Sequence, residues 1–182
     1  MPNWCSNTLE VSGMNPEQLK EFKTKSLVPA DNKGPNEYDF TFEGIHPTPP
    51  ESLEDDWYNW RILNWGTKWD CSESYIAADT ENTFIVSYDT AWAPNISWIQ
   101  KASEMFPDLY FKLSFMEPGC NFCGVAYCEN GDLSVDEGPI EWTDENGNVV
   151  ETNDDCMWYR VATNEVIEDE DFYPFENNPF DN

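Results

Sequence analysis

Basic residues are scarce in this sequence. Its 182 residues include 36 Asp and Glu but only 9 Lys and Arg, so the formal net charge at pH 7 is −27. A surface of that sign repels nucleic acid and anionic membranes, which argues against direct binding to either, and it attracts basic surfaces such as those that hold DNA or RNA. The imbalance is strongest after residue 112, where 18 acidic residues accompany only Arg160.

Histidine and long apolar runs are also scarce. His46 is the single histidine, so a Ser-His-Asp or Cys-His site would have one possible base, and His46 lies in a proline-rich turn without a local partner. No run reaches the roughly 18 apolar residues of a membrane span. The first residues show no basic end and no apolar stretch of a signal peptide. We therefore expect a soluble, cytoplasmic protein.

Cysteines do not form a complete metal-binding pattern. Cys120, Cys123 and Cys128 have part of a zinc spacing, but a tetrahedral zinc site needs four ligands, and the sequence offers no second close pair. In a reducing cytosol the six cysteines would be mostly reduced, and we expect them to act as small buried side chains. The sequence therefore predicts no metal and no cofactor.

Aromatic residues are abundant, with 9 Trp, 8 Tyr and 11 Phe, which is enough to build a core and argues against a disordered acidic chain. Alternating apolar residues predict strands over residues 4–12, 38–42, 74–79, 83–89 and 109–115. Helices are expected after Asn15, with Pro16 at the first helical position and Gln18 as a capping-box residue, from Ser52 as a cap to about Leu63 with Gly66 as its stop, and from Pro94 to Phe106. This order is that of a ferredoxin-like split β-α-β sandwich of the α+β class, with an inserted helix after the first helix.

Two hairpins are expected after the last of these strands. The Asn130-Gly131 dipeptide predicts a turn between residues 122–128 and 133–135, and residues 140–142 and 149–151 form a second candidate pair. We therefore predict one α+β domain over residues 1–163, with a β-hairpin extension from about residue 120. An acidic, aromatic tail follows at residues 164–182.

Several short motifs resemble a known family. They are MPNWCSN at residues 1–7, NWGTKWD at 64–70, TAWAP at 90–94, EPG at 117–119 and FCG at 122–124. In combination they resemble the YubB-like ferredoxin-like-domain family, which is carried mainly by bacteriophages and plasmids. The resemblance implies the same fold and a mobile-element origin. It implies no particular activity and supplies no catalytic residues.

The segment at residues 64–70 is a candidate ligand site. Two tryptophans flank a Gly-Thr-Lys loop, so indoles could stack on a small molecule or peptide while charged groups orient it. The candidate pocket residues are Trp65, Lys68, Trp69, Asp70 and Trp92. In the competing interpretation, Trp65 and Trp69 fill the core where a helix meets the next strand, and Lys68 pairs with a nearby carboxylate.

The acidic hairpins and tail are candidate partner-binding elements. Carboxylates two residues apart on a strand face the same way about 6.6 Å apart, so a strand can present an ordered anionic row. Acids in the tail would steer a partner while aromatic side chains fill its pockets. The candidate residues are Asp132, Asp136, Glu137, Glu141, Asp144, Glu145, Glu168, Asp169, Glu170, Asp171, Phe172 and Tyr173.

These observations favour a non-enzymatic binding protein. The leading hypothesis is a mobile-element protein that binds and inhibits or modulates a basic, nucleic-acid-handling host protein, such as a defence protein, by nucleic-acid mimicry. The alternative is a small ligand-binding domain or enzyme that uses a tryptophan-lined pocket around residues 64–70. Acidity that serves only solubility, and a role in virion assembly, are two further interpretations.

Overall fold

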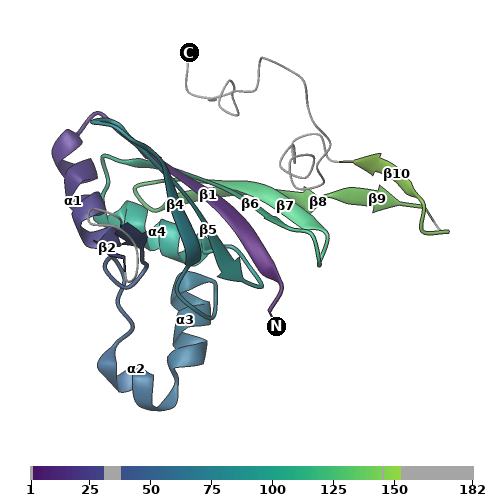
Figure 1. The fold of residues 1–182 in the computed structure, drawn as a ribbon, viewed down its shortest axis with the longest axis horizontal. Helices are drawn as coiled ribbons and strands as arrows, with labels where there is room; N and C mark the ends of the chain where they lie inside the picture. Colours follow the sequence, from purple (N-terminus) through teal and green to yellow (C-terminus); the bar gives the residue numbers. More distant parts are fainter. Residues whose placement is uncertain (1, 31–37, 145, 153–182) are drawn as a thin grey trace.

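A six-stranded antiparallel sheet dominates the computed structural model, which describes residues 2–30, 38–144 and 146–152 (Figure 1). The strand order is β4-β5-β1-β6-β7-β8, and every neighbouring pair is antiparallel. The strands are β1 (Trp4–Ser12), β4 (Ser72–Asp79), β5 (Thr83–Ala91), β6 (Tyr110–Glu117), β7 (Phe122–Glu129) and β8 (Asp132–Pro139).

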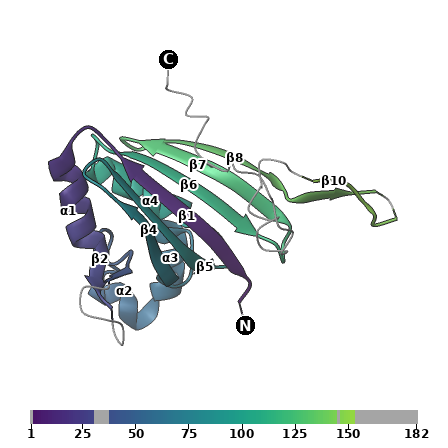
Figure 2. The ribbon, with the colours of Figure 1, turned by 45° about the horizontal axis from the view of Figure 1, so that its top comes forward.

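Two helices, α1 (Pro16–Ser26) and α4 (Ile96–Met105), lie on the same side of this sheet (Figures 1 and 2). The elements β1, α1, β4, β5, α4 and β6 follow one another in the split β-α-β order, and their strands lie in the order β6-β1-β5-β4. This is the ferredoxin-like arrangement of the α+β class, so the predicted fold is confirmed. The β7–β8 hairpin extends the sheet beyond β6.

The remaining elements lie around this framework. Between α1 and β4 the chain forms β2 (Leu27–Pro29), β3 (Tyr38–Phe40), α2 (Pro50–Asp55) and α3 (Trp57–Trp65). After β8, the strands β9 (Glu141–Thr143) and β10 (Val149–Thr152) pair as an arm that extends past the end of the sheet in both views (Figures 1 and 2). The helices among the described residues are all too short or too polar to traverse a lipid bilayer.

The core fills the space between the helices and the sheet. Phe22 of α1 is fully buried and its ring contacts those of Phe84, Phe106 and Phe111 at centroid distances of 5.6–6.2 Å. Trp98 of α4 is also fully buried, and its indole N–H donates to the backbone oxygen of Phe42 at 3.1 Å. Edge-to-face ring contacts of this kind stabilise a core beyond simple burial of apolar area.

Local sequence explains where α1 begins. The Asn15 side chain accepts a hydrogen bond from the backbone N–H of Gln18, and Pro16 occupies the first turn, as predicted. The Gln18 side chain does not return to the cap. It bonds instead to Asp108 at 2.8 Å, which ties the start of α1 to the loop before β6.

The inserted helix differs from the prediction. Ser52 is not a cap but lies inside α2, which begins at Pro50, and a second helix, α3, begins after a break at Asp56 (φ −142°). Leu63 is 76% exposed, and the buried side chain of α3 is Trp65. Because the backbone of Asp56 is not helical, residues 52–63 do not form one continuous helix, and the periodicity of a single helix does not predict which side chains of α3 are buried. Gly66 ends α3 in the left-handed conformation, as expected.

Both predicted hairpins are present. Asn130 (φ 47°) and Gly131 (φ 81°) both adopt the left-handed conformation between β7 and β8, which is the pattern of a type I′ turn. The tail predicted at residues 164–182 lies outside the described residues.

Candidate functional site: the open face of the sheet

Among the described residues, no helix lies on the face of the sheet opposite α1 and α4 (Figure 2). Side chains alternate across a strand, so the two faces are defined by residue parity. On β1, Cys5, Leu9 and Val11 are buried against the helices, while the alternate residues Ser6, Thr8 and Glu10 point to the other side. We call this second side the open face.

The open face is acidic. Six carboxylates lie on this face, as shown by the register of the strands and by the lining of the hollow described below. They belong to Glu10, Glu73, Asp89, Glu129, Asp132 and Asp136. Lys112 is the only basic residue in the six strands, and it lies on the same face with its ammonium 6.0 Å from the Tyr127 ring. Partial burial raises the pKa of Glu10, and the positive charge of Lys112 opposes this shift.

Three of these carboxylates form what we call the acidic ridge: Glu129, Asp132 and Asp136. Glu129 and Asp132 lie directly opposite each other across the β7–β8 pair, and Asp136 lies four residues further along β8 on the same face. Four residues of strand span about 13 Å. Like charges directly opposite on neighbouring strands destabilise a sheet, so the ridge is not explained by stability.

The other predicted acidic residues are distributed differently. Glu137 has the opposite parity on β8 and is turned away from the ridge. Glu141 lies on β9, where its backbone pairs with the Asn121 side chain. The Asp144 carboxylate accepts bonds from Asn146 and Asn148 in its own turn, and the Asn148 side chain lowers its pKa most. Glu145, Glu168, Asp169, Glu170, Asp171, Phe172 and Tyr173 lie outside the described residues.

The three tryptophans of the predicted ligand pocket are divided between the core and the surface. Trp65 is fully buried: its indole N–H donates to the backbone oxygen of His46 at 2.8 Å, and its ring packs edge-on against Phe42. Trp69 and Trp92 are 37% and 49% exposed. Trp65 is therefore part of the core, as the competing interpretation held, whereas Trp69 and Trp92 belong to the surface.

The charged residues of that segment are also engaged within the fold. The Asp70 carboxylate accepts hydrogen bonds from the Thr41 hydroxyl (2.6 Å), the Phe42 backbone (2.8 Å) and the Cys71 backbone (2.8 Å). Within the described ranges, Lys68 does not pair with a carboxylate. Its ammonium lies 4.5 Å from the Trp69 ring centre and 5.6 Å from that of Tyr58, which are cation–π contacts.

The side chain of His46 contacts residues of α3. Its ring lies 5.0 Å from that of Trp60, and Nε2 is 3.2 Å from the Asn64 side-chain oxygen. Both contacts come from α3, with Asn64 18 residues along the chain, so the local sequence around His46 does not reveal them. Arg61 reinforces the same corner: its guanidinium lies 4.6 Å from the Trp65 ring and donates to the Glu43 carboxylate at 2.9 Å.

The described thiols are poorly suited to nucleophilic chemistry. Burial raises the pKa of Cys5 to about 12, and burial also raises the pKa of Cys71 and of Cys128. Cys120 is exposed, and its hydrogen bond with the Glu117 carboxylate raises its pKa. Among the described residues, no three His, Cys, Asp or Glu side chains gather as ligands for a metal ion.

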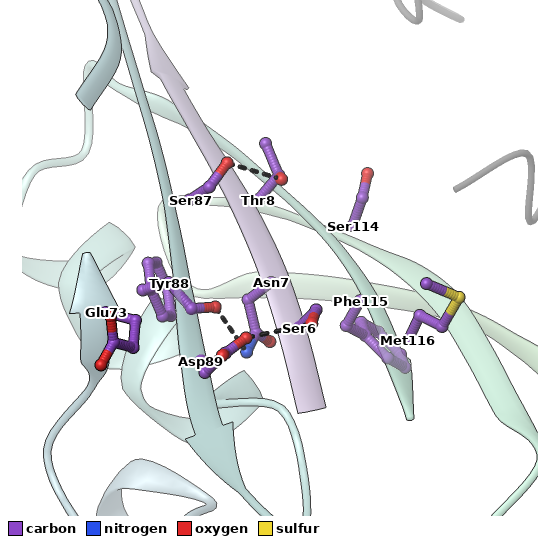
Figure 3. A pocket seen from close by; sticks show the side chains of 10 residues that line it. All are labelled: Ser6, Asn7, Thr8, Glu73, Ser87, Tyr88, Asp89, Ser114, Phe115 and Met116. Atoms are coloured by element: carbon purple, nitrogen blue, oxygen red, sulfur yellow. Dashed lines mark hydrogen bonds between the residues drawn. The ribbon is translucent and has the colours of Figure 1, made fainter. Parts of the chain in front are cut away.

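A hollow of about 320 Å³ opens on the open face, across β4, β5, β1 and β6 (Figure 3). It is lined by Ser6, Asn7, Thr8, Glu73, Ser87, Tyr88, Asp89, Ser114, Phe115 and Met116. Sequence reasoning missed these residues. The alternation of Ser6, Thr8 and Glu10 on one side of β1 is a local signal of a polar face, but it does not indicate that the face is hollowed.

The architecture is that of a ferredoxin-like α+β domain with a hairpin added to one edge of its sheet. Residues 64–171 match the family model described as the ferredoxin-like domain in Api92-like protein, and the chain belongs to this family. The resemblance inferred from the motifs is therefore confirmed.

Two relatives support this assignment. The uncharacterized protein YubB of Escherichia coli strain K12 is 34% identical over 89 residues, which are 47% of this chain and 61% of YubB, so the match spans less than two thirds of that relative. The crystal structure of Api92 from Yersinia pseudotuberculosis superposes with a TM-score of 0.59, covering 79% of this chain and 100% of that one. Its sequence identity is 11%, so this likeness shows the fold alone.

Proposed function

We propose that this protein is a non-enzymatic binding protein that uses its acidic open face to occupy a basic, nucleic-acid-binding surface of another protein. In this proposal the chain comes from a bacteriophage or plasmid and acts in the cytoplasm of a host cell. Its target is a nucleic-acid-handling protein, such as a defence protein, which it inhibits or modulates by mimicking nucleic acid.

The observation that carries the proposal is the charge distribution on the sheet. Six carboxylates share the open face with one lysine, and no helix of the described part of the chain covers them. A groove that neutralises phosphates has the opposite sign, so charge complementarity favours association and speeds it. The proposal predicts that binding weakens steeply with salt, because it rests on exposed charges.

The acidic ridge supplies a second argument. Glu129 and Asp132 are directly opposite across two paired strands, an arrangement that costs stability. A pair of this kind is easily removed by substitution, so its presence is consistent with a use in binding. The type I′ turn at Asn130-Gly131 fixes the register of the two strands and hence the relative position of the carboxylates.

The rigidity of the acidic ridge also supports the proposed binding function. The ridge lies on strands that belong to the main sheet, and the other side of β7 packs through Ala126 and Cys128 into the core. Charges held by a packed sheet lose little conformational entropy on binding. The array is sparser than duplex DNA, which carries one charge per roughly 1.7 Å of helix axis, so the mimicry concerns a few phosphate positions and not a full duplex.

Capture from a bacterial lysate, followed by DNA displacement, tests the proposal. The full chain is compared with a ridge variant (Glu129→Gln, Asp132→Asn, Asp136→Asn) at about 50 and 300 mM salt. We expect the full chain to retain nucleic-acid-binding proteins at low salt and to displace labelled duplex DNA from them. The ridge variant should lower the slope of log affinity against log salt by about 3, one unit per lost charge.

The matched control removes three carboxylates elsewhere. Glu17→Gln, Glu54→Gln and Glu81→Gln change exposed acids on α1, α2 and the β4–β5 turn, with the same change in net charge. This variant should bind like the unmodified chain. The proposal is wrong if both variants lose binding equally, because net charge alone would then explain it, or if a captured protein holds the chain and DNA together.

A further inference from the structure

The hollow on the open face combines negative charge with hydroxyl and apolar surface. Glu73 and Asp89 are the only charged side chains among its ten lining residues, and both are acids. Ser6, Thr8, Ser87 and Ser114 contribute hydroxyls, and Met116 contributes apolar surface. A volume of about 320 Å³ is at the lower end of the range typical of small-ligand sites.

One of the two carboxylates is held in place and the other is unengaged. The Ser6 hydroxyl donates to Asp89 Oδ1 at 3.0 Å, which leaves the second oxygen of Asp89 available. Within the part of the chain that the structure describes, the Glu73 carboxylate takes part in no hydrogen bond or ion pair. Both acids can therefore accept donors from a bound cation.

The backbone at Glu73 is unusual. Its φ is 52°, in the left-handed region that costs a non-glycine residue about 1–2 kcal/mol. It lies in a register shift of β4 between Ser72 and Tyr75. Bulges of this type redirect side chains beside binding sites, and strained residues persist where the surrounding structure enforces them. Here the irregular strand brings a free carboxylate to the rim of the hollow.

Aromatic surface adjoins the hollow. Trp4 lies two residues before Ser6 on the same face of β1, is 41% exposed, and has its ring centre 6.5 Å from that of Trp69. A guanidinium group is planar: its edge carries five N–H donors, which suit carboxylates and hydroxyls, and its flat faces stack on apolar and aromatic surface. An ammonium is a compact point charge and would use the hydroxyl and apolar lining less well.

We propose that this hollow is a receptor for a guanidinium group, namely an arginine side chain of a basic partner, with Glu73 and Asp89 as its acceptors. This inference rests on the proposed function for the identity of the partner. It adds a specific anchor, about one side chain in size, at the opposite side of the open face from the acidic ridge.

The test uses N-acetyl-arginine amide as the ligand, titrated into the isotope-labelled full chain and followed by NMR. We expect saturable shifts at Ser6, Glu73 and Asp89. N-acetyl-citrulline amide, which has nearly the same shape without the charge, should bind at least about tenfold more weakly, since a hydrogen bond to a charged group contributes about 1.5–3 kcal/mol. The near-isosteric variants Asp89→Asn and Glu73→Gln should each weaken arginine binding about tenfold.

Glu81→Gln is the matched control, because it neutralises an exposed carboxylate of the β4–β5 turn, outside both the hollow and the acidic ridge. It should leave the affinity for the arginine compound unchanged. Equal binding of arginine and citrulline compounds would overturn the inference, as would unchanged affinity in both Asp89→Asn and Glu73→Gln. Shifts produced by maltose and not by the arginine compound would also overturn it, because they would identify a neutral saccharide site.

The two proposals can fail separately. If the arginine compound binds in the hollow but no nucleic-acid-binding protein is captured, the proposed function fails and the guanidinium site stands. If such a protein is captured through the ridge but the arginine compound does not bind, the guanidinium site alone is wrong.

Discussion

The two faces of the six-stranded sheet are made from alternate residues of the same strands, yet they differ in almost every property. The helix-covered face is apolar and aromatic, with Leu9, Phe84 and Phe111 fully buried beneath α1 and α4. The open face is polar, with six carboxylates and one lysine. Because side chains alternate along a strand, half of the strand residues build the core and the other half form the exposed polar surface.

This difference implies that stability and binding are carried by different side chains. Burial of apolar area is the dominant favourable contribution to folding, and it is concentrated on the covered face. The high negative charge of the whole chain works against compactness through self-repulsion. Substitutions on the two faces should therefore have effects of different size and of opposite sign on the free energy of unfolding.

The largest expected effect is that of Trp65→Ala. This side chain is fully buried, so its removal leaves a cavity and should lower the free energy of unfolding by about 3–5 kcal/mol. Denaturant unfolding followed by circular dichroism measures the change. Trp92→Ala is the control, because that side chain is half exposed and should cost much less. Similar losses in both variants would show that the separation into core and surface tryptophans is wrong.

Gly66→Ala should have the next largest effect. Gly66 has a φ of 87° at the end of α3, and a Cβ there would lie 2.9 Å from the backbone oxygen of Pro94. The left-handed conformation alone costs about 1–2 kcal/mol for alanine. The matched control is Gly147→Ala, which has a φ of 81° but no atom within 4 Å of the added Cβ. Thermal unfolding should rank the two variants in that order.

The ridge variant, with Glu129→Gln, Asp132→Asn and Asp136→Asn, should change stability little or raise it slightly. Removing two opposed charges relieves a repulsion of about 0.2–1 kcal/mol. Its urea midpoint should equal or exceed that of the unmodified chain, although its binding to a basic partner should be weaker. A clear loss of stability would mean that these carboxylates support the fold.

The smallest expected effect concerns Glu10. Partial burial raises its pKa above 4.5 in the folded state, so ionisation is disfavoured by folding. The contribution of Glu10 is therefore most favourable at low pH and declines as the pH rises from about 4.5 through the folded-state pKa. Glu10→Gln should be slightly more stable than the unmodified chain at pH 7 but not at pH 4. Thermal unfolding at the two pH values checks the sign.

Much of the fold could be predicted from local sequence. The alternation of Phe111, Leu113 and Phe115 identified β6, and Asn130-Gly131 identified the β7–β8 turn. Asn15-Pro16 marked the start of α1, and Gly66 marked the end of α3. These signals are local, because each depends on the period or backbone freedom of a few neighbouring residues.

The surface features could not be predicted in the same way. Trp65 and Trp69 are four residues apart, and only tertiary contacts, such as those of Trp65 with Phe42 and the His46 backbone, distinguish the buried residue from the exposed one. The bulge at Glu73 depends on pairing with β5, and the hollow requires four strands to be assembled. Alternation did predict a shared face for Asp132 and Asp136, because that depends only on strand parity.

Carboxylate footprinting of the full chain, with and without a captured basic partner, tests the central claim most directly. Carbodiimide labelling followed by mass spectrometry reports the accessibility of each carboxylate separately. We predict that Glu10, Glu73, Asp89, Glu129, Asp132 and Asp136 become protected in the complex, while Glu17, Glu21 and Glu54 remain as reactive as in the free protein. Protection of the helix carboxylates, with the open-face carboxylates still labelled, would contradict the account.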